Sequence, residues 1–240
     1  MKVYSITDIG KVRPINEDSC YAPQHGEQFC AVADGMGGHN AGEVASAMAV
    51  KVFSEYMRDV QVLTPEALRA SVARANDAIF RASQESEQVS GMGTTFSGLA
   101  MRGANAYIAH VGDSRIYLIR RGAIMQVTMD HTLVAEMVLK GLITVREARV
   151  HPRRNIITRA LGTDSRVEID ILQLELRRGD VFFLCTDGLT NHVPEREILH
   201  VTLSAADWDA KLRRLVATAL DNGGYDNITA MYAVYEEANG

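Results

Sequence analysis

The sequence predicts an antiparallel α+β fold built in layers. Runs typical of strands come in consecutive groups, segments typical of helices come in pairs, and no Pro-rich linker, low-complexity stretch or internal repeat divides the 240 residues. A doubly wound parallel sheet would instead alternate single strands with single helices. The length suits one large domain or two small ones. We expect a single domain over residues 1–240.

Alternating or continuous apolar runs predict eight strands. Their residues are 3–8, 28–34, 94–101, 104–111, 115–120, 169–175, 180–186 and 228–235.

Apolar residues at helical spacing predict three longer helices, over residues 41–58, 65–84 and 206–221. Asn40 and Glu43 have the spacing of a capping box for the first helix. Thr64 is placed to cap the second, which begins with a proline, and Gly223 is placed to end the third. The positions expected to face the core are Val44, Ala45, Met48, Val52 and Tyr56 in the first helix, Leu68, Val72, Ala75 and Ile79 in the second, and Trp208, Leu212, Leu215 and Ala219 in the third.

Residues 130–162 fit this pattern less well. They contain two short helical pieces, 133–140 and 145–150, and a basic cluster of Arg149, Arg153, Arg154 and Arg159. A long excursion from a sheet is where substrate-facing surfaces tend to be. A solvated basic surface without a role is an equally good interpretation of the arginines alone.

Composition and charge indicate an ordinary globular protein. Hydrophobic residues make up 47%, charged residues 23%, and the net charge is −5, so we expect neither a nucleic-acid nor a membrane partner. No run approaches the ~20 apolar residues of a membrane span, and residues 1–10 contain no stretch of signal-peptide length. Cys20, Cys30 and Cys185 lack metal-ligand spacing and are expected as small buried hydrophobes in a reducing, cytoplasmic compartment.

Aspartates at strand ends are the informative pattern. Asp34, Asp113 and Asp187 each end an apolar run, and Asp226 precedes one. A single Asp-Gly pair is more often just a turn, but four such positions are harder to dismiss. Converging carboxylates repel one another unless a multivalent cation neutralises them. Oxygen donors favour Mg²⁺ or Mn²⁺ over zinc or copper.

Other phosphoryl-transfer chemistries lack their motifs. The sequence has no G-x-x-x-x-G-K-[ST] loop, no H-E-x-x-H and no G-x-S-x-G. No cysteine is followed six residues later by the arginine of a cysteine phosphatase, because Gly26, Met36 and Asn191 occupy those positions.

Seven motifs in order resemble the bacterial type 2C protein phosphatases, the metal-dependent PPM family. The one deviation is Thr132, where serine is commoner. The matching segments are Arg13-Pro-Ile-Asn16-Glu17-Asp18, Asp34-Gly-Met-Gly-Gly-His39 with Gly42-Glu43, Gly91-Met-Gly93-Thr94-Thr95, Val111-Gly112-Asp113-Ser114-Arg115, Thr128-Met-Asp130-His131, Cys185-Thr186-Asp187-Gly188-Leu189 and Gly224-Tyr225-Asp226-Asn227-Ile228-Thr229.

The resemblance implies a four-layer α-β-β-α sandwich of two antiparallel sheets flanked by helix pairs, with residues 130–162 as a flap. It also implies two ions of Mn²⁺ or Mg²⁺. Asp34 would bridge both and the Gly35 carbonyl would bind one, while Asp187 and Asp226 would hold the other. Asp113 would help Asp187 hold a third, weaker ion. Glu17 and Asp18 would bind directly or through water.

The implied reaction is hydrolysis of phosphoserine and phosphothreonine in proteins by a metal-activated water, without a phosphoenzyme. Arg13 would bind the phosphate oxygens and contribute to catalysis, and His39 would protonate the leaving oxygen. The other six histidines are interpreted as structural or loop residues.

The expected partners are phosphorylated proteins, a Ser/Thr kinase and its substrates among them, and the expected state is a monomer. Two alternatives remain at this point. One is a phosphoprotein-binding pseudophosphatase, which loss of a metal ligand would favour. The other is a regulator-type phosphatase acting on an anti-sigma-factor antagonist, which a fused sensor domain would favour.

Overall fold

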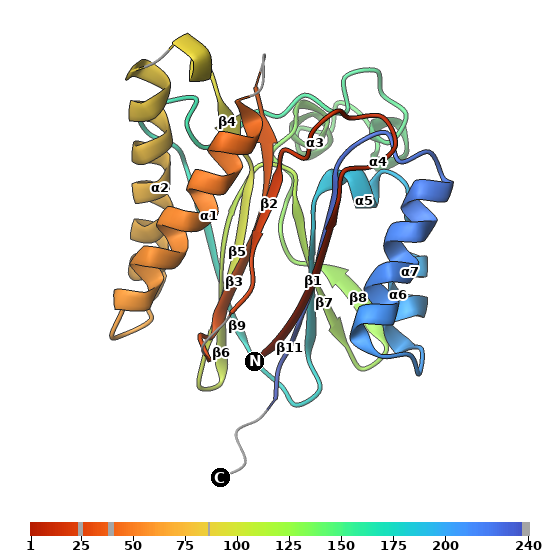
Figure 1. The fold of residues 1–240 in the computed structure, drawn as a ribbon. Coiled ribbons are helices and arrows are strands. Elements are labelled where there is room, and N and C mark those ends of the chain that lie inside the picture. Colours follow the sequence, from red (N-terminus) through yellow and green to blue (C-terminus); the bar gives the residue numbers. More distant parts are fainter. Residues whose placement is uncertain (24–25, 38–40, 86, 237–240) are drawn as a thin grey trace.

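Two antiparallel sheets form the centre of the molecule (Figure 1). The computed structural model describes residues 1–23, 26–37, 41–85 and 87–236. The first sheet has the order β1 (Lys2–Asp8), β11 (Ile228–Val234), β10 (Val181–Cys185), β7 (Arg115–Arg120) and β8 (Ala123–Gln126). The second has the order β2 (Asp18–Tyr21), β3 (Phe29–Met36), β5 (Phe96–Arg102), β6 (Asn105–Val111) and β9 (Asp170–Glu175), with β4 (Gly93–Thr94) paired to β3.

A helix pair covers the outer face of each sheet (Figure 1). Helices α1 (Gly42–Asp59) and α2 (Pro65–Glu85) cover the second sheet, and α6 (Glu195–Leu203) and α7 (Trp208–Asp221) cover the first. The shorter helices are η1 (Glu87–Val89), α3 (Leu133–Leu139), α4 (Val145–Ala148) and α5 (Asp187–Thr190). The predicted α-β-β-α sandwich is confirmed.

The central strands are buried on both faces, which explains their continuous apolar runs. In β3, Ala31 and Ala33 face the cluster formed with α1 and α2, while Cys30 and Val32 pack between the sheets. Strand β10 alternates in the same way, with Phe182 between the sheets. Because successive side chains point to opposite faces, a strand with two apolar faces cannot show the alternation typical of an exposed antiparallel sheet.

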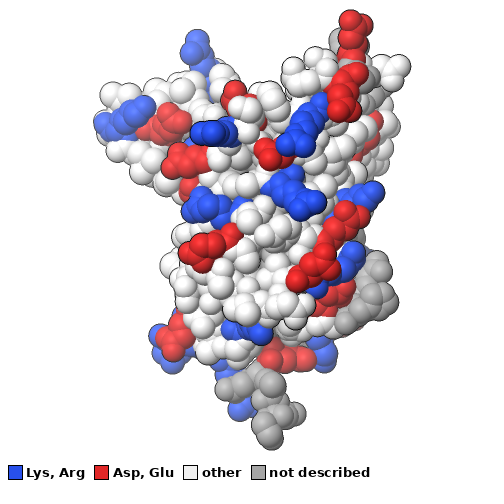
Figure 2. Space-filling view, turned by 90° about the vertical axis from the view of Figure 1, so that its left-hand side faces the viewer, with Lys and Arg blue, Asp and Glu red and all other residues white. Residues whose placement is uncertain are grey.

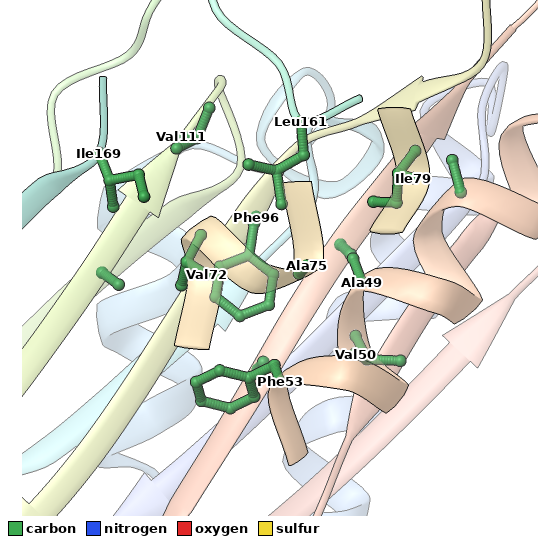
Figure 3. Packing of buried hydrophobic residues seen from close by; sticks show 14 of the residues in the cluster. Ala49, Val50, Phe53, Val72, Ala75, Ile79, Phe96, Val111, Leu161 and Ile169 are labelled. Atoms are coloured by element: carbon green, nitrogen blue, oxygen red, sulfur yellow. The ribbon is translucent and has the colours of Figure 1, made fainter. Parts of the chain in front are cut away.

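Phe53 of α1 joins the helix pair to the second sheet (Figure 3). Its ring is fully buried and makes edge contacts with Phe29 and Phe96, at centroid distances of 5.7 and 5.0 Å. The core-facing stripe of α1 runs through Ala45, Ala49 and Phe53. The predicted α1 face was therefore wrong by part of a turn. Of its five members only Ala45 is fully buried, and the others pack half-buried against the same cluster.

Helix starts agree with the sequence only in part. The hydroxyl of Thr64 accepts from the Ala67 amide at 3.1 Å, so the predicted cap of α2 is confirmed. The N-cap of α1 is Ala41, without a side-chain hydrogen bond, so the predicted start one residue earlier was wrong; Asn40 lies outside the described residues. Helix α7 begins at Trp208, two residues later than predicted, because the carboxylate of Asp207 caps it.

Several short elements were not predicted. Strands β2 and β8 have four residues each, too few to show a period. Helix α6 begins after a proline and buries only Ile198, Val201 and Thr202. The single strand predicted over residues 94–101 is divided into β4 and β5, because the Thr95 amide bonds back to the carbonyl of Asp34.

The excursion over residues 130–162 returns to its own starting point. Its two ends meet where Thr132 and Ile157 form a β-bridge and the Leu133 amide donates to the Ile156 carbonyl. The two predicted helical pieces are confirmed as α3 and α4. Arg149, Arg153 and Arg154 are exposed, whereas Arg159 is half-buried in ion pairs with Glu168 and Asp170, so only three of the four arginines of the basic cluster are exposed.

On the face formed by α1 and α2, basic and acidic side chains are interspersed (Figure 2), so this face offers no concentrated field for a polyanion. The three cysteines are free, and Cys30 and Cys185 are fully buried as predicted, but Cys20 is only half-buried, so the prediction was wrong for that residue. None of the helices in the described part of the chain has the length and hydropathy of a bilayer-spanning segment.

We predict that Phe53→Ala lowers the free energy of unfolding by about 3–5 kcal/mol, because it leaves a cavity between two other aromatic rings. Val62→Ala is the matched control, since Val62 is 65% exposed, and it should change stability by less than about 0.5 kcal/mol. Urea unfolding followed by circular dichroism measures both. Equal effects of the two variants would contradict the assignment of Phe53 to the core.

Candidate active site

Five carboxylates gather at one end of the sandwich. They come from both sheets: Asp18 from β2, Asp34 from β3, Asp113 from the turn after β6, Asp187 from the first position of α5 and Asp226 from the loop before β11. Burial raises the pKa of Asp34, and the negative charges of the other four aspartates raise it further. The convergence expected from the sequence is therefore present.

Strand pairing places the first two carboxylates. Asp18 and Asp34 are direct partners in the β2–β3 register. The Asp34 amide donates to the Thr95 hydroxyl at 2.9 Å, and the Thr94 hydroxyl donates to the Asp34 carbonyl at 2.8 Å. Two adjacent threonines thus fix the backbone of Asp34, a role that the sequence motif alone did not reveal.

The glycines after Asp34 and Asp187 are required by close backbone packing. A Cβ on Gly35 would lie 2.1 Å from the Gly42 carbonyl oxygen, and one on Gly188 would lie 1.9 Å from the Asn227 carbonyl oxygen. Neither position has a positive φ. The Asp-Gly pairs are therefore contact points that hold aspartates from separate elements close together, rather than ordinary turns.

Asn227 ties three segments of the site together. Its side-chain amide donates to the carbonyls of Ile9 and Ile15, and its oxygen accepts from the Glu17 amide at 2.8 Å. These bonds hold the loop that carries Arg13 against the loop that carries Asp226. Asn227 belongs to a recognised motif, but sequence reasoning assigned it no function.

Arg13 lies at the open edge of the acidic cluster. Its guanidinium donates to Oδ2 of Asp226 at 2.8 Å, and its side chain is 46% exposed. An exposed ion pair of this kind contributes little to stability. The fork of donors is therefore available to an anionic ligand that approaches the carboxylates from solvent.

The Glu17 side chain contacts the start of α1. A Cβ on Gly42 would meet its Oε1 at 2.4 Å, and burial raises the pKa of this carboxyl group while the Gly42 amide opposes the shift by a hydrogen bond. Glu17 thus caps a helix from another segment. His39, the predicted acid, lies outside the described residues.

Burial and mutual repulsion favour the protonated form of these carboxyl groups. Burial, opposed by hydrogen bonds from Thr229 and Thr186, raises the pKa of Asp18 to about 7. Burial together with the charge of Asp187 raises the pKa of Asp113 to about 8. The pKa values of Asp34 and Asp187 are also raised, first by burial and then by the other aspartates. Such a cluster is costly without a compensating positive charge.

The same residues fit a hard divalent cation. Oδ1 of Asp18 and Oδ1 of Asp113 are buried without a hydrogen-bond partner, although buried polar atoms are nearly always bonded. Among the described residues, no three His, Cys, Asp or Glu side chains are already gathered as a ready-made ion site. Mg²⁺ sites typically combine one or two carboxylates with waters, so they need no closed set of protein ligands. The oxygen donors of these aspartates therefore suit a divalent cation that keeps several of its waters.

A cavity of about 630 Å³ lies at the other end of β3. Phe29, Met57 and Leu63 are among its lining residues. Phe29 begins β3 whereas Asp34 is near its end, so this cavity is remote from the five aspartates. It contains none of the predicted site residues, and we do not assign the active site to it.

Comparison with known proteins identifies the family. The family model described as protein phosphatase 2C matches residues 13–231. The chain belongs to the protein phosphatase 2C family. The serine/threonine phosphatase stp of Listeria monocytogenes is 38% identical over 232 residues, covering 94% of this chain and 92% of that protein. All seven sequence motifs quoted above lie within the matched range.

Solved structures agree with the family assignment. The crystal structure of the Mycobacterium tuberculosis serine/threonine phosphatase PstP/Ppp superposes with a TM-score of 0.91 at 38% identity, covering 98% of both chains. The catalytic domain of the serine/threonine protein phosphatase PstP, in complex with 2 manganese ions, superposes with a TM-score of 0.88 at 36% identity, again over 98% of both chains.

We predict that the metal-free phosphatase loses stability as pH rises from about 4 to about 8. A carboxyl group whose folded pKa is raised stabilises the fold fully below its unfolded pKa and loses that contribution as pH rises through the folded value. For Asp18 and Asp113 the loss is complete near pH 7 and 8 respectively.

Thermal unfolding in EDTA across this pH range measures the effect. Asp113→Asn is the matched variant, because it keeps the shape without the charge, and its Tm should fall less steeply with pH than that of the wild type. A Tm that rises or stays constant over the range would contradict the predicted cost of the acidic cluster.

Proposed function

We propose that this serine/threonine protein phosphatase hydrolyses phosphoserine and phosphothreonine in other proteins with the help of two divalent cations, Mn²⁺ or Mg²⁺. The observation that carries the proposal is the convergence of five buried or half-buried carboxylates, two with unpartnered oxygens, beside the exposed guanidinium of Arg13. The family assignment supports the same reaction, and a PstP catalytic domain of this fold is a complex with 2 manganese ions.

Each carboxylate has a place in this proposal. Asp34, the Gly35 carbonyl, Asp187 and Asp226 would hold the two cations, and Asp34 would serve both. Asp113 and Asp187 would hold a third, weaker ion.

Asp18 and Glu17 act at the edge of the cation site. The Thr186 hydroxyl already donates to Oδ2 of Asp18 at 2.8 Å, which leaves Oδ1 for a cation or for a water bound to one. The Glu17 carboxylate contacts Gly42, so we assign it an indirect role through water.

The chain's own side chains then perform the remaining steps. Cations held by these carboxylates would acidify a water molecule and neutralise phosphate charge. Arg13 binds the phosphate oxygens through its planar fork of donors. His39 protonates the leaving seryl or threonyl oxygen. No side-chain nucleophile is needed, consistent with the absence of nucleophile motifs.

The two alternative functions are disfavoured. A pseudophosphatase would be expected to lack one of Asp34, Asp187 or Asp226, and all three are present. A regulator restricted to an anti-sigma-factor antagonist is supported by no feature of the sequence. Phosphorylated proteins, including a Ser/Thr kinase and its substrates, thus remain the proposed partners of a monomeric, cytoplasmic enzyme.

We predict that turnover requires Mn²⁺ or Mg²⁺ and that EDTA abolishes it. Asp34→Ala should lose nearly all activity, because it removes the carboxylate proposed to contact both ions. Hydrolysis of p-nitrophenyl phosphate and of a phosphothreonine peptide measures both effects. Full activity of a metal-stripped sample would refute the proposed reaction.

We predict that substitutions of Arg13 and His39 affect different kinetic parameters. Arg13→Ala should raise KM, with some loss of kcat, because the guanidinium binds phosphate in the ground state and the transition state. His39→Ala should lower kcat by ~10²-fold or more on a phosphopeptide. It should do much less on p-nitrophenyl phosphate, whose leaving group hardly needs a proton. Equal losses on the two substrates would remove His39 from the acid role.

We predict that the flap, residues 130–162, selects the phosphoprotein. Replacing the exposed Arg153 and Arg154 with alanine should lower kcat/KM for a phosphoprotein, more so at low salt, because exposed charges act over a Debye length. The matched control replaces Arg196 and Arg213, exposed residues of α6 and α7.

Both double variants should keep normal turnover of p-nitrophenyl phosphate, which is too small to reach the flap. The measurement is a paired assay of both substrates across an ionic-strength series. If neither substrate is affected, the arginines form only a solvated surface. If both are affected together, the arginines act on folding or on the cation site.

A further inference from the structure

His131 is a buried histidine to which the proposed reaction gives no part. It lies in the flap neck, which we define as residues 130–133 and 156–159, where the two ends of the flap pair. Its side chain is nearly inaccessible to solvent, and both ring nitrogens have polar partners. A buried ring that makes hydrogen bonds on both sides fixes the relative positions of its partners, because hydrogen bonds are directional and apolar contacts are not.

A reciprocal pair of hydrogen bonds joins His131 to Gly112. The Gly112 amide donates to Nδ1 of the His131 ring at 3.0 Å, and the His131 amide donates to the Gly112 carbonyl at 2.8 Å. Gly112 directly precedes Asp113, whose Oδ1 is one of the buried oxygens without a partner. His131 therefore grips the backbone beside a carboxylate of the candidate active site.

The backbone of Gly112 is held in one conformation by its surroundings. Its φ is +105°, and a Cβ there would lie 2.6 Å from Cβ of Thr95. Thr95 in turn accepts from the Asp34 amide and shares a hydrogen bond with Ser114. A chain of direct contacts thus leads from His131 through Gly112 and Thr95 to Asp34.

The far side of the ring is anchored to β9. Nε2 of His131 lies 3.1 Å from Oδ2 of Asp170, and Arg159 donates to the other oxygen of the same carboxylate at 3.2 Å. The His131 carbonyl also accepts from the Thr158 amide at 2.8 Å. Both strands of the flap neck are therefore bound to this one residue or to its partner carboxylate.

These partners fix the tautomer of the ring. A backbone amide can only donate, so Nδ1 must carry the lone pair and the proton must be on Nε2. Nε2–H then donates to the Asp170 carboxylate. Nη1 of Arg159, which also lies 3.4 Å from Nε2, can only donate and bonds to the other oxygen of that carboxylate. The neighbouring His110 ring packs at a centroid distance of 4.9 Å and is held by the Met129 carbonyl.

We propose that His131 is a positioning residue that holds the Gly112–Asp113 backbone in register with the flap neck and thereby places the Asp113 carboxylate. The proposal rests on the phosphatase function proposed above. On this proposal, activity depends on a hydrogen-bond acceptor at position 131 that faces the Gly112 amide. The contact to Asp170 serves to orient that side chain.

Three variants of His131 separate the two bonds. The amide oxygen of His131→Asn can occupy the place of Nδ1 and accept from Gly112. The longer side chain of His131→Gln reaches toward Asp170 and leaves the Gly112 amide without its acceptor, while His131→Ala loses both bonds. The control is His151→Gln, because Nδ1 of His151 also accepts a backbone amide in the flap, from Arg153, but His151 lies outside the flap neck.

The kinetic assay is p-nitrophenyl phosphate hydrolysis as a function of Mn²⁺ concentration, on variants whose thermal unfolding remains cooperative. His131→Gln and His131→Ala should lose about 10- to 100-fold in kcat or in apparent Mn²⁺ affinity, the usual effect of removing a residue that orients a ligand. KM for the substrate should be unchanged, His131→Asn should retain most of the activity, and the control should match the wild type. An Asn variant as impaired as the Gln variant, or a Gln variant with normal activity, would overturn the proposal.

A measurement on the wild-type protein makes the test independent of turnover and of variant folding. Ring ¹⁵N spectra, with and without Mg²⁺, should show His131 protonated at Nε2, with Nδ1 coupled across the hydrogen bond to the Gly112 amide. A proton on Nδ1 would overturn the proposal whatever the activity. Absence of metal-dependent turnover in a wild type with the expected ring spectrum would instead refute the proposed function.

Discussion

Repulsion among buried carboxylates at one end of the sandwich is the constraint on which the rest of the structure depends. Asp18, Asp34, Asp113 and Asp187 are all buried enough for their pKa values to be raised. This arrangement lowers the stability of the fold when no cation is bound, because each charge is desolvated and faces others of the same sign. The surrounding structure must hold these groups together until a cation neutralises them.

The sandwich holds them by backbone contacts that leave little room for adjustment. Two glycines allow neighbouring segments to touch at this end of the sandwich: Gly188 after β10 meets Asn227 before β11, and Gly35 of β3 meets Gly42 at the start of α1. Hydroxyl groups such as those of Thr95 and Thr186 bond to the aspartates or to their backbone. The helix pairs supply the apolar burial that stabilises this rigid frame. Stability is therefore located in the layers and reactivity at their common end.

The architecture and the convergence of the aspartates could be predicted from the sequence, but the contacts that hold the aspartates in place could not. Apolar runs that end in aspartate could be recognised in the sequence, because a strand buried on both faces consists mainly of apolar residues. The face of α1 was misjudged because half-buried Val44 and Met48 are as apolar as the fully buried Ala49 and Phe53. The roles of Asn227 and His131 depend on partners 210 and 19 residues away, and no local pattern encodes such pairings.

The most direct test of the central claim is to locate bound cations in crystals grown with Mn²⁺, by anomalous scattering. We predict two strong peaks among the oxygens of Asp34, Gly35, Asp187 and Asp226, with a weaker third beside Asp113. Peaks at these positions would show that the repelling carboxylates are held for cations. Well-ordered crystals with no peak at this end of the sandwich, or with peaks only elsewhere, would contradict the account.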